Sequence, residues 1–135
     1  MTISKKLITK GFIMAGLMNA SVLLFSRFFT NTTIPKYDPE VMSNFGLLMI
    51  LIWGLAYISV AKTYEHVKWL VAVFALEKLI YGYIWLQWIT TSSVAEVYQE
   101  DAMAGIFYAI YGVNDWLFCM FFTYVCIRLL KTKND

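Results

Sequence analysis

Four runs of apolar residues, each long enough to form a membrane-spanning helix, dominate the pattern of hydrophobic and polar positions along the chain. They cover residues from about 8 to 29, 41 to 61, 67 to 90 and 104 to 130. A hydrocarbon core of about 30 Å needs roughly 20 residues of helix, which each run supplies. The apolar residues come in unbroken stretches rather than in the alternation of barrel strands. The pattern therefore predicts an all-α membrane protein, an antiparallel bundle of four transmembrane helices.

The composition supports a single membrane domain. Of the 135 residues, 60% are hydrophobic and 15% are charged, which is too apolar a balance for a water-soluble domain of this size. The chain has two prolines, seven glycines and no low-complexity run, so we find no linker between domains. We expect one four-helix transmembrane domain over residues 1–135.

The positions of lysine and arginine predict the orientation. One side carries Arg27 and Lys36. The other side carries Lys5, Lys6, Lys10, Lys62, Lys68, Arg128, Lys131 and Lys133. Because positive residues in short loops stay on the cytoplasmic side, both termini are predicted to be cytoplasmic, in a multi-pass protein of a bacterial inner membrane. The net charge of +2 reflects this bias and does not indicate nucleic-acid binding.

The loop between the first two apolar runs contains a pattern typical of a helix start. Asp38 can cap a helix, Pro39 can occupy its first position, and Glu40 favours its positive end. We expect the second helix to begin there. Asn31 opens a glycosylation pattern, Asn-Thr-Thr, which nothing else in the sequence supports.

An acid and a base, Glu77 and Lys78, lie side by side in the third apolar run, FALEKLIYGYIWLQW. A short loop joins the third and fourth helices, so positions equally far from the middle of that loop lie at about the same depth. By this count Lys78 is level with Asp115, which follows Asn114, and Asn19 of the first helix lies at a similar depth. Five polar side chains are thus predicted to meet near the bilayer centre.

The charges of this cluster do not balance. Isolated charges at such depth cost about 3 kcal/mol each on insertion scales, so they are expected to turn inward and pair. Lys78 and Asp115 are the predicted pair, and Glu77 leaves one negative charge uncompensated if all three groups are ionised. Either one carboxyl group keeps its proton or a cation completes the site.

Aromatic residues at helical spacing are expected to surround the cluster. The third and fourth helices supply some of them and the second helix supplies the others. The expected wall of the site consists of Tyr81, Trp85, Tyr111, Trp53 and Tyr57. Aromatic rings around a buried carboxylate suit a ligand with an amine, through charge pairing and cation–π contact.

Residues for metal, haem or redox chemistry are sparse. His66 is the only histidine and lies at the edge of an apolar run. Cys119 and Cys126 are seven positions apart on one predicted helix, too far for a disulfide bond. The sequence also has no phosphate-binding glycine loop, no nucleophile elbow and no CxxC pair. We therefore predict no metal, no cofactor and no identifiable catalytic residue.

Two families are similar to this sequence in outline. The stretch WLVAVFALE, residues 69–77, resembles the tryptophan-then-glutamate helix of the sterol-isomerase and sigma-2-receptor-like (EXPERA) proteins, although it lies on a different helix in chain order. The small multidrug transporters also combine four helices with one membrane glutamate, but theirs lies in the first helix, where this chain has Asn19. The first resemblance covers about one helix, and no residue role is carried over from either family.

Three functions follow as hypotheses. The first is binding of a small amphipathic or cationic molecule, for carriage or sensing, with Glu77 as the ligand or proton acceptor and Lys78 and Asp115 as the pair that positions it. The second is an accessory or assembly subunit of a larger membrane complex, whose charged cluster only fixes helix packing. The third is an isomerase-like enzyme with Glu77 and Asp115 as an acid–base couple, which we rank below the non-enzymatic functions. A homodimer is compatible with each of them.

Overall fold

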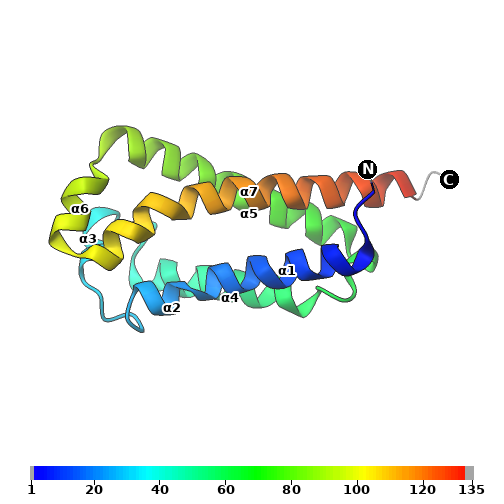
Figure 1. Cartoon of the computed structure of the whole chain (residues 1–135), viewed down its shortest axis with the longest axis horizontal. Coiled ribbons are helices and arrows are strands. Elements are labelled where there is room, and N and C mark those ends of the chain that lie inside the picture. The colour runs from blue at the N-terminus through cyan, green and yellow to red at the C-terminus, as the bar shows by residue number, and fades with distance from the viewer. Residues whose placement is uncertain (1, 133–135) are drawn as a thin grey trace.

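The computed structural model describes residues 2–132, and every regular element among them is helical. The long helices are α1 (Lys5–Ala20), α4 (Asn44–Ser59), α5 (Lys68–Thr91) and α7 (Ala102–Thr132). The short elements are α2 (Val22–Phe25), α3 (Thr33–Tyr37), α6 (Val94–Glu100) and a 3-10 helix, η1 (Tyr64–His66). The long helices lie roughly along one axis, and the start of α1 and the end of α7 share one end of the molecule (Figure 1). The predicted all-α class is confirmed.

Three helical segments are long and apolar enough to cross a membrane: Lys5–Phe25, Lys68–Thr91 and Ala102–Thr132. Helix α4 is also apolar but has 16 residues, roughly 24 Å at 1.5 Å per residue. Large apolar side chains on the outer surface, such as Leu24, Phe45 and Met120, are more than half exposed. Such a surface suits lipid rather than water, so these features indicate a membrane protein.

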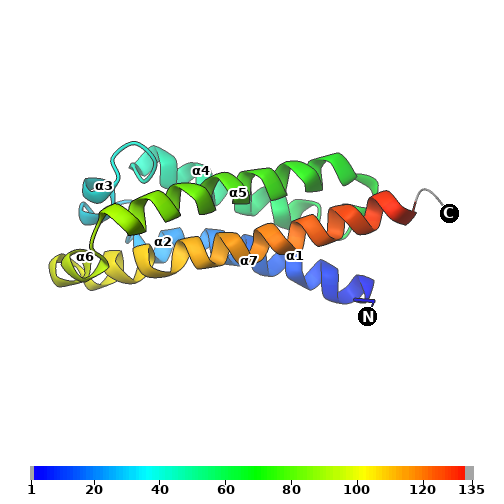
Figure 2. The ribbon, with the colours of Figure 1, turned by 90° about the horizontal axis from the view of Figure 1, so that it is seen from above.

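The long helices pack as two close pairs, α1 with α4 and α5 with α7 (Figures 1 and 2). In the first pair, a Cβ atom on Gly16 would lie 2.6 Å from the carbonyl oxygen of Gly54. In the second pair, a Cβ atom on Gly112 would lie 1.8 Å from Cδ2 of Trp85. Residues without a side chain at these points allow the helices to approach, as is usual in membrane bundles.

The core between the two pairs is aromatic and has two parts. In the part nearer the termini, the contacting rings have centroids 4.8 to 6.4 Å apart and belong to Phe12, Tyr57, Phe74 and Phe122. In the other part, Trp88 stacks on Tyr108 with centroids 4.2 Å apart. Along the helices, the polar residues of the predicted central cluster lie between these two parts of the core.

The first apolar run ends earlier than predicted. Helix α1 is interrupted at Ser21, and α2 ends at Phe25 rather than continuing to Phe29. The hydroxyl of Ser26 accepts a hydrogen bond of 3.0 Å from the Phe29 amide, and residues 27–29 adopt positive φ angles between 49° and 65°. Left-handed backbone cannot continue an α-helix, so the chain turns here.

The second long helix begins later than predicted. Asp38 is the C-cap residue of α3, and its carboxylate accepts a 3.3 Å hydrogen bond from the Val41 amide, but the residues that follow it form a turn rather than the start of α4. Ser43 caps α4 instead, because its hydroxyl accepts a hydrogen bond of 3.1 Å from the Gly46 amide. The expected helix start at Asp38 and Pro39 is therefore wrong. Helices α5 and α7 lie within about two residues of their predicted bounds, whereas α6 was not predicted.

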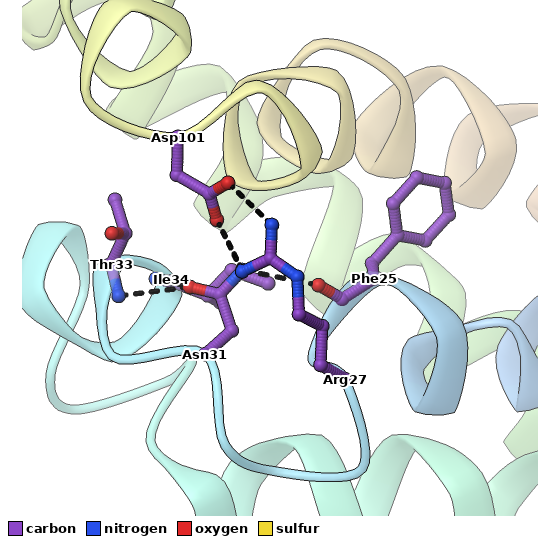
Figure 3. Close-up of polar contacts among 6 residues, drawn as sticks. All are labelled: Phe25, Arg27, Asn31, Thr33, Ile34 and Asp101. Carbon is purple, nitrogen blue, oxygen red and sulfur yellow. Dashed lines mark hydrogen bonds and ion pairs between the residues drawn. The ribbon is translucent and has the colours of Figure 1, made fainter.

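A polar network fastens the turn after α2 to the start of α7 (Figure 3). The Arg27 guanidinium donates to both carboxylate oxygens of Asp101, at 2.8 and 3.3 Å. Asn31 also donates to Asp101, and its side-chain oxygen accepts from the Thr33 amide at 2.9 Å. Asn31 is 3% exposed, so its amide serves this network and is not available to a glycan.

Candidate functional site

A chain of hydrogen bonds joins all four long helices where the two pairs meet. Lys78 Nζ on α5 donates to Asp115 Oδ1 on α7 and to Asn19 Oδ1 on α1, both at 2.8 Å. Asn19 Nδ2 in turn donates to the Ile50 carbonyl oxygen on α4 at 2.9 Å. Lys78 is 1% exposed. The contact between Lys78 and Asp115 is the one expected from their equal distance to the loop, and Asn19 lies at the expected depth.

The side chain of Glu77 bonds to a different helix from that of its neighbour Lys78. Its Oε2 atom accepts a hydrogen bond from the Tyr57 hydroxyl on α4. Among residues 2–132 no other side chain or amide donates a hydrogen bond to this carboxylate, which is 7% exposed. The second carboxylate oxygen of Glu77 is thus available to another donor. Lys78 Nζ lies 5.2 Å from the centre of the Tyr57 ring, so Tyr57 contacts both charged residues.

A small cavity lies beside this cluster, between α1, α2, α5 and α7. The volume open to the centre of a water molecule is about 40 Å³, enough for a few waters. Its polar lining comes from Asn19, Ser21, Glu77, Lys78, Tyr81, Tyr111, Asn114 and Asp115. Seven of the ten residues that the sequence marked for this site therefore border one cavity.

Tyr111 lines this cavity, and its hydroxyl group has no hydrogen-bond partner. Tyr111 is 8% exposed, and its oxygen is the one buried side-chain nitrogen or oxygen atom within residues 2–132 that lacks a hydrogen bond. Buried polar groups are nearly always bonded, and an unsatisfied one costs about 1–3 kcal/mol. Among the described residues, this hydroxyl is therefore the buried polar group that a ligand bound beside Tyr111 could still satisfy.

The cavity opens toward the side of the bundle rather than toward its ends. Its remaining lining is apolar and includes Met18, Phe25 and Ile110, of which Ile110 is 39% exposed. These residues belong to the α1–α2 segment and to α7, which lie next to each other in Figure 2. In a membrane this opening would face acyl chains. The cavity is thus polar inside and apolar at its mouth.

Glu77 is also reached from the opposite side of α5. Glu77 and Tyr81 line a second, mostly apolar groove between α4 and α5, together with Trp53, Val73, Leu76 and Ile80. The carboxylate thus lies between the polar cavity and an apolar groove. An amphipathic molecule could approach it from either side.

The expected aromatic wall is formed only in part. Tyr81 and Tyr111 line the cavity, and Tyr57 reaches it through its bond to Glu77. Trp53 lies in the groove and packs against Phe74, with ring centroids 6.1 Å apart. Trp85 lies away from the cavity, because its indole packs over Gly112 and donates to the Tyr108 carbonyl oxygen at 2.8 Å. The structure adds Ser21, for which the only sequence signal was a polar residue two positions after Asn19.

The charges at the cavity favour a cation or a proton. Glu77 and Asp115 carry two negative charges when ionised, and Lys78 carries one positive charge. Within residues 2–132 no three His, Cys, Asp or Glu side chains lie together as metal ligands would. The arrangement can instead hold an extra proton or an organic ammonium group, which needs carboxylate and hydroxyl acceptors rather than a full coordination shell.

Comparison with known proteins gives no relative from which a function could be carried over. No family model matches the chain, and no curated protein or solved structure matches it either. The two outline resemblances to membrane families therefore gain no support. Function has to be inferred from the geometry of the site.

Proposed function

We propose that the protein binds a small amphipathic cation, for carriage or sensing, with the cationic group in the cavity beside Glu77. The observation that carries the proposal is a buried cavity that holds two acids, one base and an unpartnered Tyr111 hydroxyl. An ammonium group would balance the charge, donate to the free oxygen of Glu77 and donate to the Tyr111 oxygen. Each of these contacts uses a group that the fold leaves unused.

The size of the cavity limits which part of the ligand enters it. Sites for whole drug-sized molecules occupy about 300–1,000 Å³. The space of about 40 Å³ open to water centres admits a head group only. The apolar remainder of the ligand would then lie at the mouth, against Met18, Phe25 and Ile110. This arrangement favours a long-chain amine over a compact polar cation.

We propose in addition that all four long helices span the membrane, with both termini in the cytoplasm. The positive residues Lys5, Lys68 and Arg128 support this orientation, because they line one hollow between the start of α1, the start of α5 and the end of α7. Lys62 lies in the connection between α4 and η1, and η1 borders the same hollow. Local thinning of the bilayer could accommodate the short α4. Single cysteines at position 62 and at position 92, in a Cys119→Ser/Cys126→Ser background, test it. A membrane-impermeant maleimide added to intact cells should label only position 92.

The accessory-subunit alternative also has an observation in its favour. The bonds from Lys78 to Asn19 and Asp115 join separate helices, which is what structural fixation requires. That alternative expects a larger partner to co-purify, and expects exchange of Lys78 and Asp115 to preserve activity. It gives no role to the free oxygen of Glu77 or to the hydroxyl of Tyr111. Those two groups therefore distinguish the functions.

Binding of a long-chain alkylamine to the purified protein tests the proposed function. The amine is titrated in a non-ionic detergent, and binding is followed by the shift in melting temperature. We expect Glu77→Gln to weaken binding at least tenfold, because it removes the uncompensated charge. Glu96→Gln is the matched control, since Glu96 is an exposed acid outside the cavity. Equal affinity of Glu77→Gln and the control would contradict the proposal.

A further inference from the structure

A second hollow lies at the end of the molecule that contains the termini, far from the Glu77 cavity. It is bounded by the start of α1, by η1, by the start of α5 and by the end of α7. Its volume open to water centres is about 350 Å³, much larger than that of the central cavity. Three cationic side chains line it, Lys5, Lys68 and Arg128, and Glu65 is the one acid among its described lining residues.

The positive charges of this hollow are only partly balanced. Glu65 pairs with Lys5, with Nζ and Oε1 3.0 Å apart. Within residues 2–132, neither Lys68 nor Arg128 forms an ion pair. The described part of the lining therefore has a net charge of +2, from three cations and one anion. An anion that entered would meet two cations without displacing an existing acid.

The hollow has features of a formed site as well as charge. The Arg128 guanidinium is half-buried and is held by a hydrogen bond to the Ile3 carbonyl oxygen. Lys68 opens the 24-residue helix α5, whose N-terminus has no side-chain cap, so the positive end of the helix adds to the field. Val125 and Leu129 supply an apolar side to the lining. Anionic and apolar groups of one molecule could both be accommodated.

We propose that this hollow binds the phosphate-bearing head group of an anionic lipid, with Lys68 and Arg128 as its principal contacts. Basic pockets between membrane helices on the cytoplasmic side bind such head groups, and the positive end of this bundle is the end proposed to be cytoplasmic. Trp69, next to Lys68, is 66% exposed, as expected for an aromatic residue at the membrane interface. Charge bias alone would place lysines at this end, as it does the exposed Lys10 and Lys62, but it would not make Lys68 and Arg128 line one hollow. The Lys68 ammonium lies 5.1 Å from the centre of the Trp69 ring and would turn from this ring to contact a head group.

Lipid binding by matched charge variants tests the proposal. Delipidated protein is mixed with micelles that contain phosphatidylglycerol, or phosphatidylcholine alone, and retained lipid is counted by native mass spectrometry. The site variant is Lys68→Gln/Arg128→Gln, and the control is Lys10→Gln/Lys62→Gln, which removes the same charge from the same end. We expect wild type and control to retain phosphatidylglycerol, and the site variant to bind it at least tenfold more weakly. Equal loss in both variants would overturn the proposal.

Two further arms keep the result decisive. Glu65→Gln removes the one competing acid of the described lining and breaks only an exposed ion pair, so it should fold normally and bind phosphatidylglycerol a few-fold more tightly. Unchanged or weaker binding by this variant would count against the site, even if Lys68→Gln/Arg128→Gln failed to fold. Inorganic phosphate is the second arm. If it stabilised the wild type as much as the lipid does, the ligand would be a free phosphate rather than a lipid.

Discussion

Glu77 and Lys78 are consecutive residues of α5, yet their side chains bond to different helices. Glu77 accepts a hydrogen bond from Tyr57 on α4, whereas Lys78 donates to Asp115 on α7 at 2.8 Å. Lys78 donates to both Asp115 and Asn19, while Glu77 keeps one oxygen without a donor among the described residues. The cluster thus has two parts. Lys78 links separate helices, whereas Glu77 has a carboxylate oxygen without a donor, and mutations in the two parts should have different effects.

Removal of the Lys78 amine should strongly destabilise the fold. Lys78→Met leaves Asp115 as a buried charge without its partner, which typically costs about 3–5 kcal/mol. The free energy of unfolding, from denaturation in mixed micelles, measures this cost. The double variant Lys78→Met/Asp115→Leu should recover most of it, since no lone charge then stays buried. The exposed Lys62→Met is the control, and a Lys78→Met variant as stable as this control would contradict the role of Lys78 in linking the helices.

Tyr111→Phe should separate binding from stability. The hydroxyl has no hydrogen-bond partner, so its removal should leave the free energy of unfolding unchanged or raise it by up to about 1–3 kcal/mol. Affinity for a long-chain alkylamine should fall, because the ligand would lose its proposed hydrogen bond to the hydroxyl oxygen. Thermal unfolding with and without the amine measures both effects. Tyr98→Phe, at an exposed position outside the cavity, should change neither; a Tyr111→Phe variant with full affinity would remove Tyr111 from the site.

The contact between Gly112 and Trp85 should tolerate no added methyl group. A Cβ atom at position 112 would lie 1.8 Å from Trp85 Cδ2, and the indole is held by its bond to the Tyr108 carbonyl. Gly112→Ala should therefore lower the free energy of unfolding by at least about 1–3 kcal/mol. In a Trp85→Ala background, Gly112→Ala should cost less than it does in wild type, because the clashing ring is then absent. Val113→Ala, 51% exposed in wild type, should have little effect by comparison.

The contact between Arg27 and Asp101 should make stability depend on pH at the acidic end. Burial acts to raise the pKa of Asp101, but the hydrogen bonds from Arg27 and Asn31 outweigh it, so the pKa lies below its ordinary value of 3.8. A carboxyl group with a lowered pKa stabilises the fold above its ordinary pKa and loses this effect as pH falls through the lower value. The stability advantage of wild type over Asp101→Asn should be constant from about pH 7 to about pH 5 and shrink below about pH 4. A stability advantage that grew as the pH fell would contradict this assignment. The Arg27→Gln variant should show a weaker pH dependence of stability than wild type in the same range.

The sequence predicted the parts of the fold that depend on depth and length. The bounds of α5 and α7 and the contact between Lys78 and Asp115 followed from hydrophobic length and from the short loop between the two helices. The end of α2 did not, because it depends on Ser26 and on the network of Asn31 with Asp101, which is 70 residues away. Such contacts between distant segments leave no periodic signal in the chain.

The aromatic residues of the site were harder to predict than its charges. Helix α5 is apolar on nearly all sides, so spacing alone could not show which ring faces the cavity. Tyr81 lines it, while Trp85, four residues later, packs over Gly112 instead. The unpartnered hydroxyl of Tyr111 is likewise a property of the packed structure and cannot be read from a sequence.

Native mass spectrometry of the detergent-purified protein, beside its Glu77→Gln and Glu96→Gln variants, tests the central claim most directly. It reports any retained small molecule and the number of subunits together. We expect a bound small mass in wild type and in Glu96→Gln that is absent from Glu77→Gln, with retained phosphatidylglycerol unchanged in all three. Identical spectra from three equally stable proteins would contradict a ligand at Glu77 and would favour a purely structural cluster in a subunit of a larger complex.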